Sequence, residues 1–127
     1  MEELHRAQKA LKDIGKPTCF LKIIKKDLPA DILYEDDCCI AFRDINPQAP
    51  SHFLVVPKKP ISMLDNIQEE DSKLLGHLLI TAKKVAAQEN LTSGYRLVIN
   101  NGEQGCQSVY HFHIDVLGGR EMEWPPG

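Results

Sequence analysis

Residues 107 to 117 read Gln-Ser-Val-Tyr-His-Phe-His-Ile-Asp-Val-Leu, and polar groups alternate with large apolar ones through the second half of this stretch. Side chains two residues apart lie on the same face of a β-strand. A strand here would place His111, His113 and Asp115 in a row on one face, with Phe112 and Ile114 on the other. Two imidazoles and a carboxylate in register point to a reaction centre or a metal site more than to an ordinary solvated face.

The size and charge of the chain suit one compact domain without a nucleic-acid or membrane partner. The 127 residues carry a net charge of −3, and the chain is long enough to bury a real core. Its basic residues are scattered among acids except for short pairs, which argues against a nucleic-acid groove. No apolar run approaches the ~20 residues of a membrane helix, and the N-terminus lacks the layout of a signal peptide. We therefore expect a cytoplasmic location, with entry to the nucleus also open.

The first half of the chain predicts two short helical segments followed by strands. Apolar residues at helical spacing predict a peripheral helix over residues 4–12 and one or two helical turns over 19–26. Two β-prone runs at 32–35 and 38–43, separated by two aspartates, predict a hairpin. The most apolar run of this half, residues 52–57, predicts a central strand.

The second half predicts one long helix and two more strands. Helical periodicity extends from Ile67 to about Glu89, and Asn66 followed by Glu69 indicates an N-cap. Residues 95–100 predict the fourth strand, and the opening stretch is the last. Strands outnumber helices and no βαβ alternation is present, so we expect an α+β fold, with an antiparallel sheet and one main helix on one face.

Residues 111–116 resemble the His-x-His-x-His-x-x signature of the histidine-triad (HIT) family, and further blocks resemble its Hint branch of nucleotide-binding proteins. The likeness runs from about residue 18 to 127 and includes residues 44–50, 52–59, 107–111, 117–120 and 124–127. It implies a peripheral segment 1–17 and a single HIT domain 18–127. It also implies a five-stranded antiparallel sheet with one long helix and one or two short ones, continued across a homodimer that binds purine nucleoside monophosphates.

The resemblance assigns roles to individual residues. It makes His113 the catalytic nucleophile, with His52, His111, Ser108 and Asp115 around it. Asp44 matches the residue that holds the ribose, and Trp124 matches one that reaches the partner subunit's site. The full nucleotide-binding set that the resemblance implies is Phe20, Phe42, Asp44, Ile45, Asn100, Gly105, Cys106, Gln107, Ser108, Val109, His113, Asp115 and Trp124.

Asp115 departs from the family pattern, because it stands where the signature has its third histidine. Attack by an imidazole nitrogen on phosphorus gives a nucleotidyl-histidine and divides a hard hydrolysis into two easier steps. A departing amine must also gain a proton, and an ionised carboxylate fits that task poorly. It also repels a phosphate oxygen about 4 Å away by a few kcal/mol.

Three hypotheses about function follow from these residues. We expect a hydrolase of purine nucleoside phosphoramidates that needs no cofactor and is impaired by Asp115. The alternative is a nucleotide-binding or interaction protein with little turnover. A zinc site built from His52, His111, His113 and Asp115 ranks third, because alternate positions on one strand rarely converge on a single ion.

Overall fold

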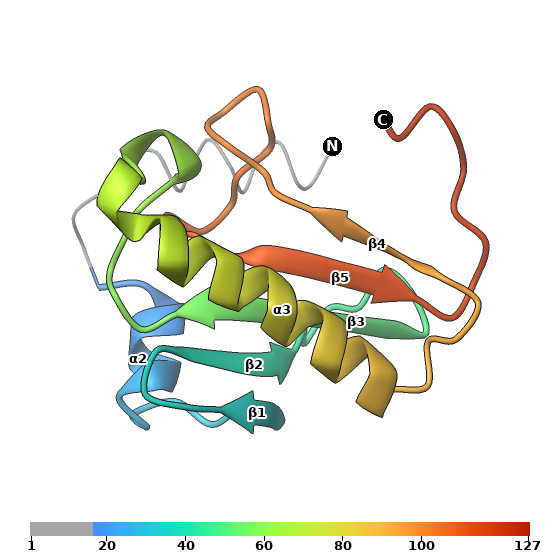
Figure 1. Ribbon diagram of the computed structural model, residues 1–127, viewed down its shortest axis with the longest axis horizontal. Helices are drawn as coiled ribbons and strands as arrows, with labels where there is room; N and C mark the ends of the chain where they lie inside the picture. The colour runs from blue at the N-terminus through green and yellow to red at the C-terminus, as the bar shows by residue number, and fades with distance from the viewer. Residues whose placement is uncertain (1–16) are drawn as a thin grey trace.

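A five-stranded antiparallel sheet forms the centre of the protein, as the computed structural model shows for the residues it describes, 17–127 (Figure 1). The strands lie in the order β1-β2-β3-β5-β4. Their bounds are Ile32–Glu35 for β1, Cys39–Arg43 for β2, Ser51–Pro57 for β3, Tyr95–Val98 for β4 and Ile114–Gly118 for β5. The predicted antiparallel sheet, its hairpin and its central strand are confirmed. The helix predicted for residues 4–12 lies outside the described residues.

The long helix α3, Ser72–Gln88, crosses one face of the sheet (Figure 1). Its buried residues include Leu78, Ala82 and Val85, which pack with Phe53 and Val55 of β3 in one apolar cluster. This packing confirms the predicted helix and the face that it covers. Within residues 17–127, no helix combines the length and the apolar character needed to span a membrane.

The start of α3 differs from the prediction. Two short 3-10 turns, η1 (Leu64–Asn66) and η2 (Glu69–Asp71), occupy the residues expected to form its first turns. The amide of Asn66 donates to the Ser62 hydroxyl instead of capping a helix. A capping box between Gln68 and Asp71 stands at the start of η2. The predicted cap at Asn66 is therefore wrong, and the regular helix begins at Ser72.

A short helix, α2 (Cys19–Ile24), packs on the opposite face of the sheet and confirms the predicted helical turns. Thr18 caps it, because its hydroxyl oxygen accepts a hydrogen bond from the Leu21 amide at 3.1 Å. Phe20 and Ile23 are buried there, in a second apolar cluster that also holds Ile40, Phe42, Leu54 and Val56. Within residues 17–127, α2 therefore covers part of the face opposite α3.

The histidine stretch keeps the predicted alternation, but only part of it is a strand. Phe112, Ile114 and Val116 are buried beneath α3. Regular pairing in β5 begins at Ile114, because the Phe112 amide donates to the Ile61 carbonyl at 2.6 Å and not to a neighbouring strand. The strand expected over 107–117 is therefore shorter, and the histidines at 111 and 113 lie in the extended segment that leads into it.

The turn between β1 and β2 is organised by the carboxylate of Asp36. It accepts hydrogen bonds from the Tyr34 hydroxyl, the amides of Cys38 and Cys39, and the ring of His77 on α3. Burial raises the pKa of Asp36, but these hydrogen bonds lower it by more, so that it lies well below its ordinary range. The ionised carboxylate therefore ties the hairpin to α3.

We expect Asp36→Ala to lower the free energy of unfolding at pH 7 by about 2 kcal/mol, because it leaves several donors without an acceptor. A carboxyl whose folded pKa is depressed stabilises the fold above its unfolded pKa of about 4, and this stabilisation is lost as pH falls. Urea unfolding at several pH values should thus show the native and variant proteins converging below pH ~4. Asp37→Ala, at the exposed neighbour, should change stability by less than about 0.5 kcal/mol. A gap of constant size down to low pH would contradict this account.

Candidate active site

The described structure brings His52, Asp115 and Asp44 together on the sheet face opposite α3. His52 lies on β3 and Asp115 on β5, and the register of these strands pairs Leu54 with Asp115. His52 Nε2 is 2.9 Å from Asp115 Oδ1 and 3.6 Å from Asp44 Oδ2. Residues far apart in the chain therefore meet because the two central strands are adjacent.

His113 presents one free ring nitrogen to this group. Its Nδ1 is 2.8 Å from the His111 carbonyl oxygen, which can only accept, so Nδ1 carries the proton. Nε2 then holds a lone pair and has no hydrogen-bond partner within residues 17–127, its nearest charged neighbour being Asp115 Oδ2 at 3.6 Å. The side chain is only 8 % exposed. A basic nitrogen is thus held in fixed orientation in a largely dry position, as a nucleophile requires.

His52 is held in the opposite tautomer. The backbone N–H of Gln48 donates to His52 Nδ1 at 3.1 Å, so this nitrogen carries the lone pair. The proton of the neutral ring therefore sits on Nε2 and is donated to Asp115 Oδ1. Sequence reasoning did not single out Gln48, and no sequence signal could have done so, because the contact is made by a backbone amide.

His111 supports the structure of the site but does not act in it as a base. Its Nε2–H donates to the Pro57 carbonyl at 2.7 Å. Burial lowers the pKa of His111, and the hydrogen bond to Pro57 offsets only part of this effect. His111 is therefore a neutral, buried ring whose carbonyl oxygen orients His113.

Aromatic side chains form one wall of the site. The Phe20 ring of α2 lies 4.9 Å from the His113 ring, edge to face at 90°. The centroids of the Phe42 and Phe20 rings are 5.5 Å apart. Both are buried, so α2 fixes the position of the ring that packs on the imidazole.

The loop before His111 holds several of the residues expected to bind the nucleotide, and the Gln107 side chain braces it. Its amide donates to the Ser62 and Val109 carbonyls at 2.9 and 3.0 Å, and its oxygen accepts from the Gly102 amide at 3.0 Å. The Gln107 side chain is only 1 % exposed. The residues on either side of it in the loop are more exposed to solvent. Asn100, Gly105, Cys106, Ser108 and Val109 are all half-buried in this region.

The loop needs a glycine at one position. A Cβ added at Gly105 would lie 2.5 Å from the Asn101 carbonyl oxygen. Cys106 then adopts a left-handed backbone with φ of 64°. The loop therefore has a tightly determined shape beside His111 and His113.

Two predicted site residues lie at the surface of the single chain. Ile45 is 98 % exposed and Trp124 is 83 % exposed. The segment that carries Trp124 is held near β4 by a hydrogen bond from Arg96 to the Glu123 carbonyl. The structure thus gathers the imidazoles, both aspartates and the aromatic wall, but it does not bring Ile45 or Trp124 into contact with them.

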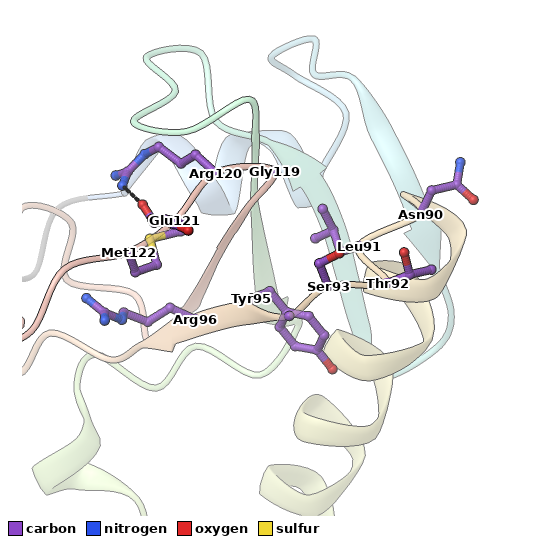
Figure 2. Close-up of a pocket in the computed structure, with 11 residues that line it drawn as sticks. Asn90, Leu91, Thr92, Ser93, Tyr95, Arg96, Gly119, Arg120, Glu121 and Met122 are labelled. Carbon is purple, nitrogen blue, oxygen red and sulfur yellow. Dashed lines mark hydrogen bonds between the residues drawn. The ribbon is translucent and has the colours of Figure 1, made fainter.

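A separate pocket lies beside β4 (Figure 2), and neither the site's imidazoles nor its two aspartates line it. The guanidinium groups of Arg96 and Arg120 there donate to backbone carbonyls, and Glu121 adds a negative charge. The pocket is lined by residues 90–96 and 119–122, none of which belongs to the predicted site. We place the chemistry at the imidazoles, because the only oriented nucleophile found among residues 17–127 is His113.

In the part of the chain that the structure describes, two groups of side chains contain donors of the kind that bind zinc. In each group, one ligand atom per residue lies within 4.8 Å of the others, and the groups are Asp36 with Cys39 and His77, and Asp44 with His52 and Asp115. Asp36 already accepts four hydrogen bonds, and burial raises the pKa of Cys39 to about 11, so its thiolate is disfavoured. In the second group the nitrogen facing the carboxylates is protonated. In this conformation, Asp36 of the first group and His52 of the second are both engaged in hydrogen bonds within the protein.

Comparisons with known proteins identify the family and agree with the fold. The model of the HIT domain matches residues 25–122. The chain is 56% identical to a 14 kDa zinc-binding protein of Zea mays, over 87% of this chain and 88% of that protein. A HIT family hydrolase from Legionella pneumophila Philadelphia 1 superposes with a TM-score of 0.83 and 50% identity, covering 85% and 97% of the two chains. A histidine triad nucleotide-binding protein from Candida albicans gives a TM-score of 0.73 at 30% identity, covering 85% and 82%.

Proposed function

Because this chain belongs to the HIT-domain family, we propose that it hydrolyses phosphoryl compounds of purine nucleosides, phosphoramidates included, through a nucleotidyl-histidine. Its fold is that of HIT hydrolases and of a histidine triad nucleotide-binding protein. The single observation that carries the proposal is the orientation of His113, whose Nδ1–H is bound to the His111 carbonyl while Nε2 has no hydrogen-bond partner among residues 17–127.

The reaction begins with attack of the His113 Nε2 lone pair on phosphorus, which displaces the leaving group and forms the nitrogen–phosphorus bond. The proton on Nδ1 stays bound to the His111 carbonyl, which stabilises the positive charge that develops on the ring. Water then attacks the nucleotidyl group and the electron pair returns to Nε2. We expect donors in the loop around Ser108, together with the side chain of Asn100, to stabilise the charge on the phosphate oxygens.

Asp115 is the observation that favours the second candidate function, a nucleotide-binding protein with little turnover. Its Oδ2 lies 3.6 Å from the nucleophilic nitrogen, so phosphorus must approach a carboxylate. Such proximity costs a few kcal/mol at intermediate dielectric. Turnover assays on an adenosine 5′-phosphoramidate and on adenosine 5′-(4-nitrophenyl) phosphate, run beside an AMP-binding titration, separate the candidates. Binding without turnover of either substrate supports the second candidate, and absence of both binding and turnover rejects both.

Asp44 has one carboxylate oxygen, Oδ2, that accepts no hydrogen bond from residues 17–127 and with which it can hold a ribose. Its Oδ1 accepts from the Asn46 amide at 2.8 Å, and Oδ2 is directed towards His52 at 3.6 Å. We expect Asp44→Ala to weaken AMP binding by about 1 to 3 kcal/mol, because the ribose hydroxyls lose a charge-assisted partner. Calorimetric titration measures the change.

The matched control is Asp44→Asn, which retains an oxygen for the Asn46 amide but loses the charge. Its affinity should lie between those of the native protein and Asp44→Ala. An unchanged dissociation constant in Asp44→Ala would show that the ribose binds elsewhere.

We also propose that two copies of the chain pair along β4, as part of the same function. The outer edge of β4 has no strand partner within residues 17–127. Leu97 pairs with Val116 of the α3-side core, so it lies on the same side of the sheet as α3. Exposed apolar side chains continue across this side, with exposures of 38 to 51 %, at Tyr95, Leu97, Ile99, Leu79 and Ile80. An unpaired edge beside an apolar surface suits a twofold interface that extends the sheet.

The dimer predicts a specific effect of charge at this edge. Leu97→Lys should shift the protein towards monomer at micromolar concentration, because a lysine would be desolvated in the twofold interface. Leu28→Lys, at an equally exposed leucine away from β4, should leave the assembly unchanged. Sedimentation velocity distinguishes the two variants, and a native protein that sediments as a stable monomer would rule the dimer out.

A further inference from the structure

The hydrogen bonds around the site determine where each proton lies. The protons of the three imidazoles are on Nε2 of His52, Nε2 of His111 and Nδ1 of His113. His52 can become an imidazolium only by adding a proton at Nδ1, where the Gln48 N–H already points. Loss of a proton from a neutral imidazole would leave an anion, so His52 as held here is not an acid.

The other neighbours of the nucleophile do not supply a proton either. His111 is buried, and burial lowers its pKa, which keeps the ring neutral. Asp115 accepts the His52 N–H with one oxygen and has its other oxygen 3.6 Å from His113 Nε2. Asp115 therefore acts as an acceptor. The described part of the site holds a nucleophile but no group poised to protonate a leaving group.

The absence of an acid among residues 17–127 has different consequences for different leaving groups. An amine that departs from phosphorus keeps the bonding electron pair and must gain a proton, because an amide anion is too basic to leave. A phenolate or carboxylate oxygen keeps the pair as a stable anion and needs no proton. A site of this kind therefore discriminates by the basicity of the leaving atom.

We propose that this site prefers nucleoside phosphoryl esters and mixed anhydrides whose leaving atom is a weakly basic oxygen, and that Asp115 is the residue that sets this preference over amines. This inference rests on the proposed nucleotidyl-histidine reaction. The His113 Nε2 lone pair forms the nitrogen–phosphorus bond, and the phosphorus–oxygen bond breaks with its electron pair on the leaving oxygen. Water then restores His113, one water proton passes to solvent, and the nucleoside monophosphate is released.

The test uses two substrates with one nucleoside, adenosine 5′-(4-nitrophenyl) phosphate and the adenosine 5′-phosphoramidate of an alkylamine. The ratio of kcat/KM for the amine substrate to that for the ester is measured in the native protein, Asp115→His and Asp115→Asn. Both substrates carry one negative charge on phosphorus, so the repulsion of the substrate phosphate by Asp115 largely cancels in the ratio. Thermal unfolding of each variant verifies that it is folded.

We expect the native protein to favour the ester and Asp115→His to raise the amine-to-ester ratio by about a hundredfold, because an imidazolium supplies the missing proton. Asp115→Asn removes the charge without adding an acid, so it should not raise the ratio. An equal increase in both variants, or no increase in Asp115→His, would overturn the proposal.

The same experiment separates failure of this inference from failure of the proposed function. Protein quenched in alkaline denaturant, in which a histidine phosphoramidate is stable, is analysed by mass spectrometry for one added nucleotidyl group on His113. A trapped adduct with an unchanged ratio rejects the leaving-group preference alone. Absence of an adduct and of turnover with both substrates rejects the hydrolase and the preference together.

Discussion

Turnover of any nucleoside phosphoryl substrate by His113→Ala should fall to about one-thousandth of the native rate or less. Of the site's imidazoles within residues 17–127, neither His52 nor His111 can replace the lost nucleophile. His52 Nδ1 accepts the Gln48 N–H and its Nε2 is protonated, whereas His111 is buried with Nε2–H bound to the Pro57 carbonyl. The variant should still bind AMP, because the aromatic wall and Asp44 do not depend on this ring. Steady-state assays and AMP titration together check both statements.

A control variant distinguishes loss of the nucleophile from general damage. His77→Gln changes an imidazole on α3 that contacts Asp36, and it retains a hydrogen-bond donor, so its turnover should match that of the native protein. The nucleotidyl adduct should be trapped in the native protein and in His77→Gln but not in His113→Ala. Appreciable turnover in His113→Ala would assign the nucleophile to another residue.

The largest effect on stability is expected at Gln107. Replacement by alanine leaves the Gly102 amide and the Ser62 and Val109 carbonyls without partners in a region where the side chain is 1 % exposed. Unsatisfied buried polar groups cost about 1 to 3 kcal/mol each, so we expect Gln107→Ala to lower the free energy of unfolding by about 3 kcal/mol. Urea unfolding followed by circular dichroism gives this difference.

The same loop provides the matched control for that experiment. Gln104 is exposed three residues earlier, and Gln104→Ala should change stability by less than about 0.5 kcal/mol. Turnover of Gln107→Ala at low temperature, where the fold persists, should also fall, because the shape of the loop beside His111 depends on this side chain. A stability equal to that of Gln104→Ala would show that the loop is held in another way.

Local sequence patterns were sufficient for the elements of the fold. The alternation at residues 111–116 specified which side chains lie beneath α3 and which face the site, because a strand side chain has only two faces to choose from. Helical periodicity located α3, but its start was misplaced at Asn66. The expected cap, Asn66 with Glu69, and the observed capping box, Gln68 with Asp71, both place an acidic residue three positions after an amide side chain. The pattern alone therefore did not distinguish them.

The sequence, through its resemblance to the HIT family, singled out the side chains that the structure brings together: three histidines, Asp44, Asp115 and the aromatic residues near them. Only the tertiary structure decided which nitrogen of each imidazole holds a proton. Those positions depend on carbonyls and amides of Gln48, Pro57 and His111, which every residue type carries and which therefore leave no mark in a sequence. The adjacency of β3 and β5 similarly decided that Asp115 meets His52, since pairing between distant strands is set by packing of the whole sheet and not by local pattern.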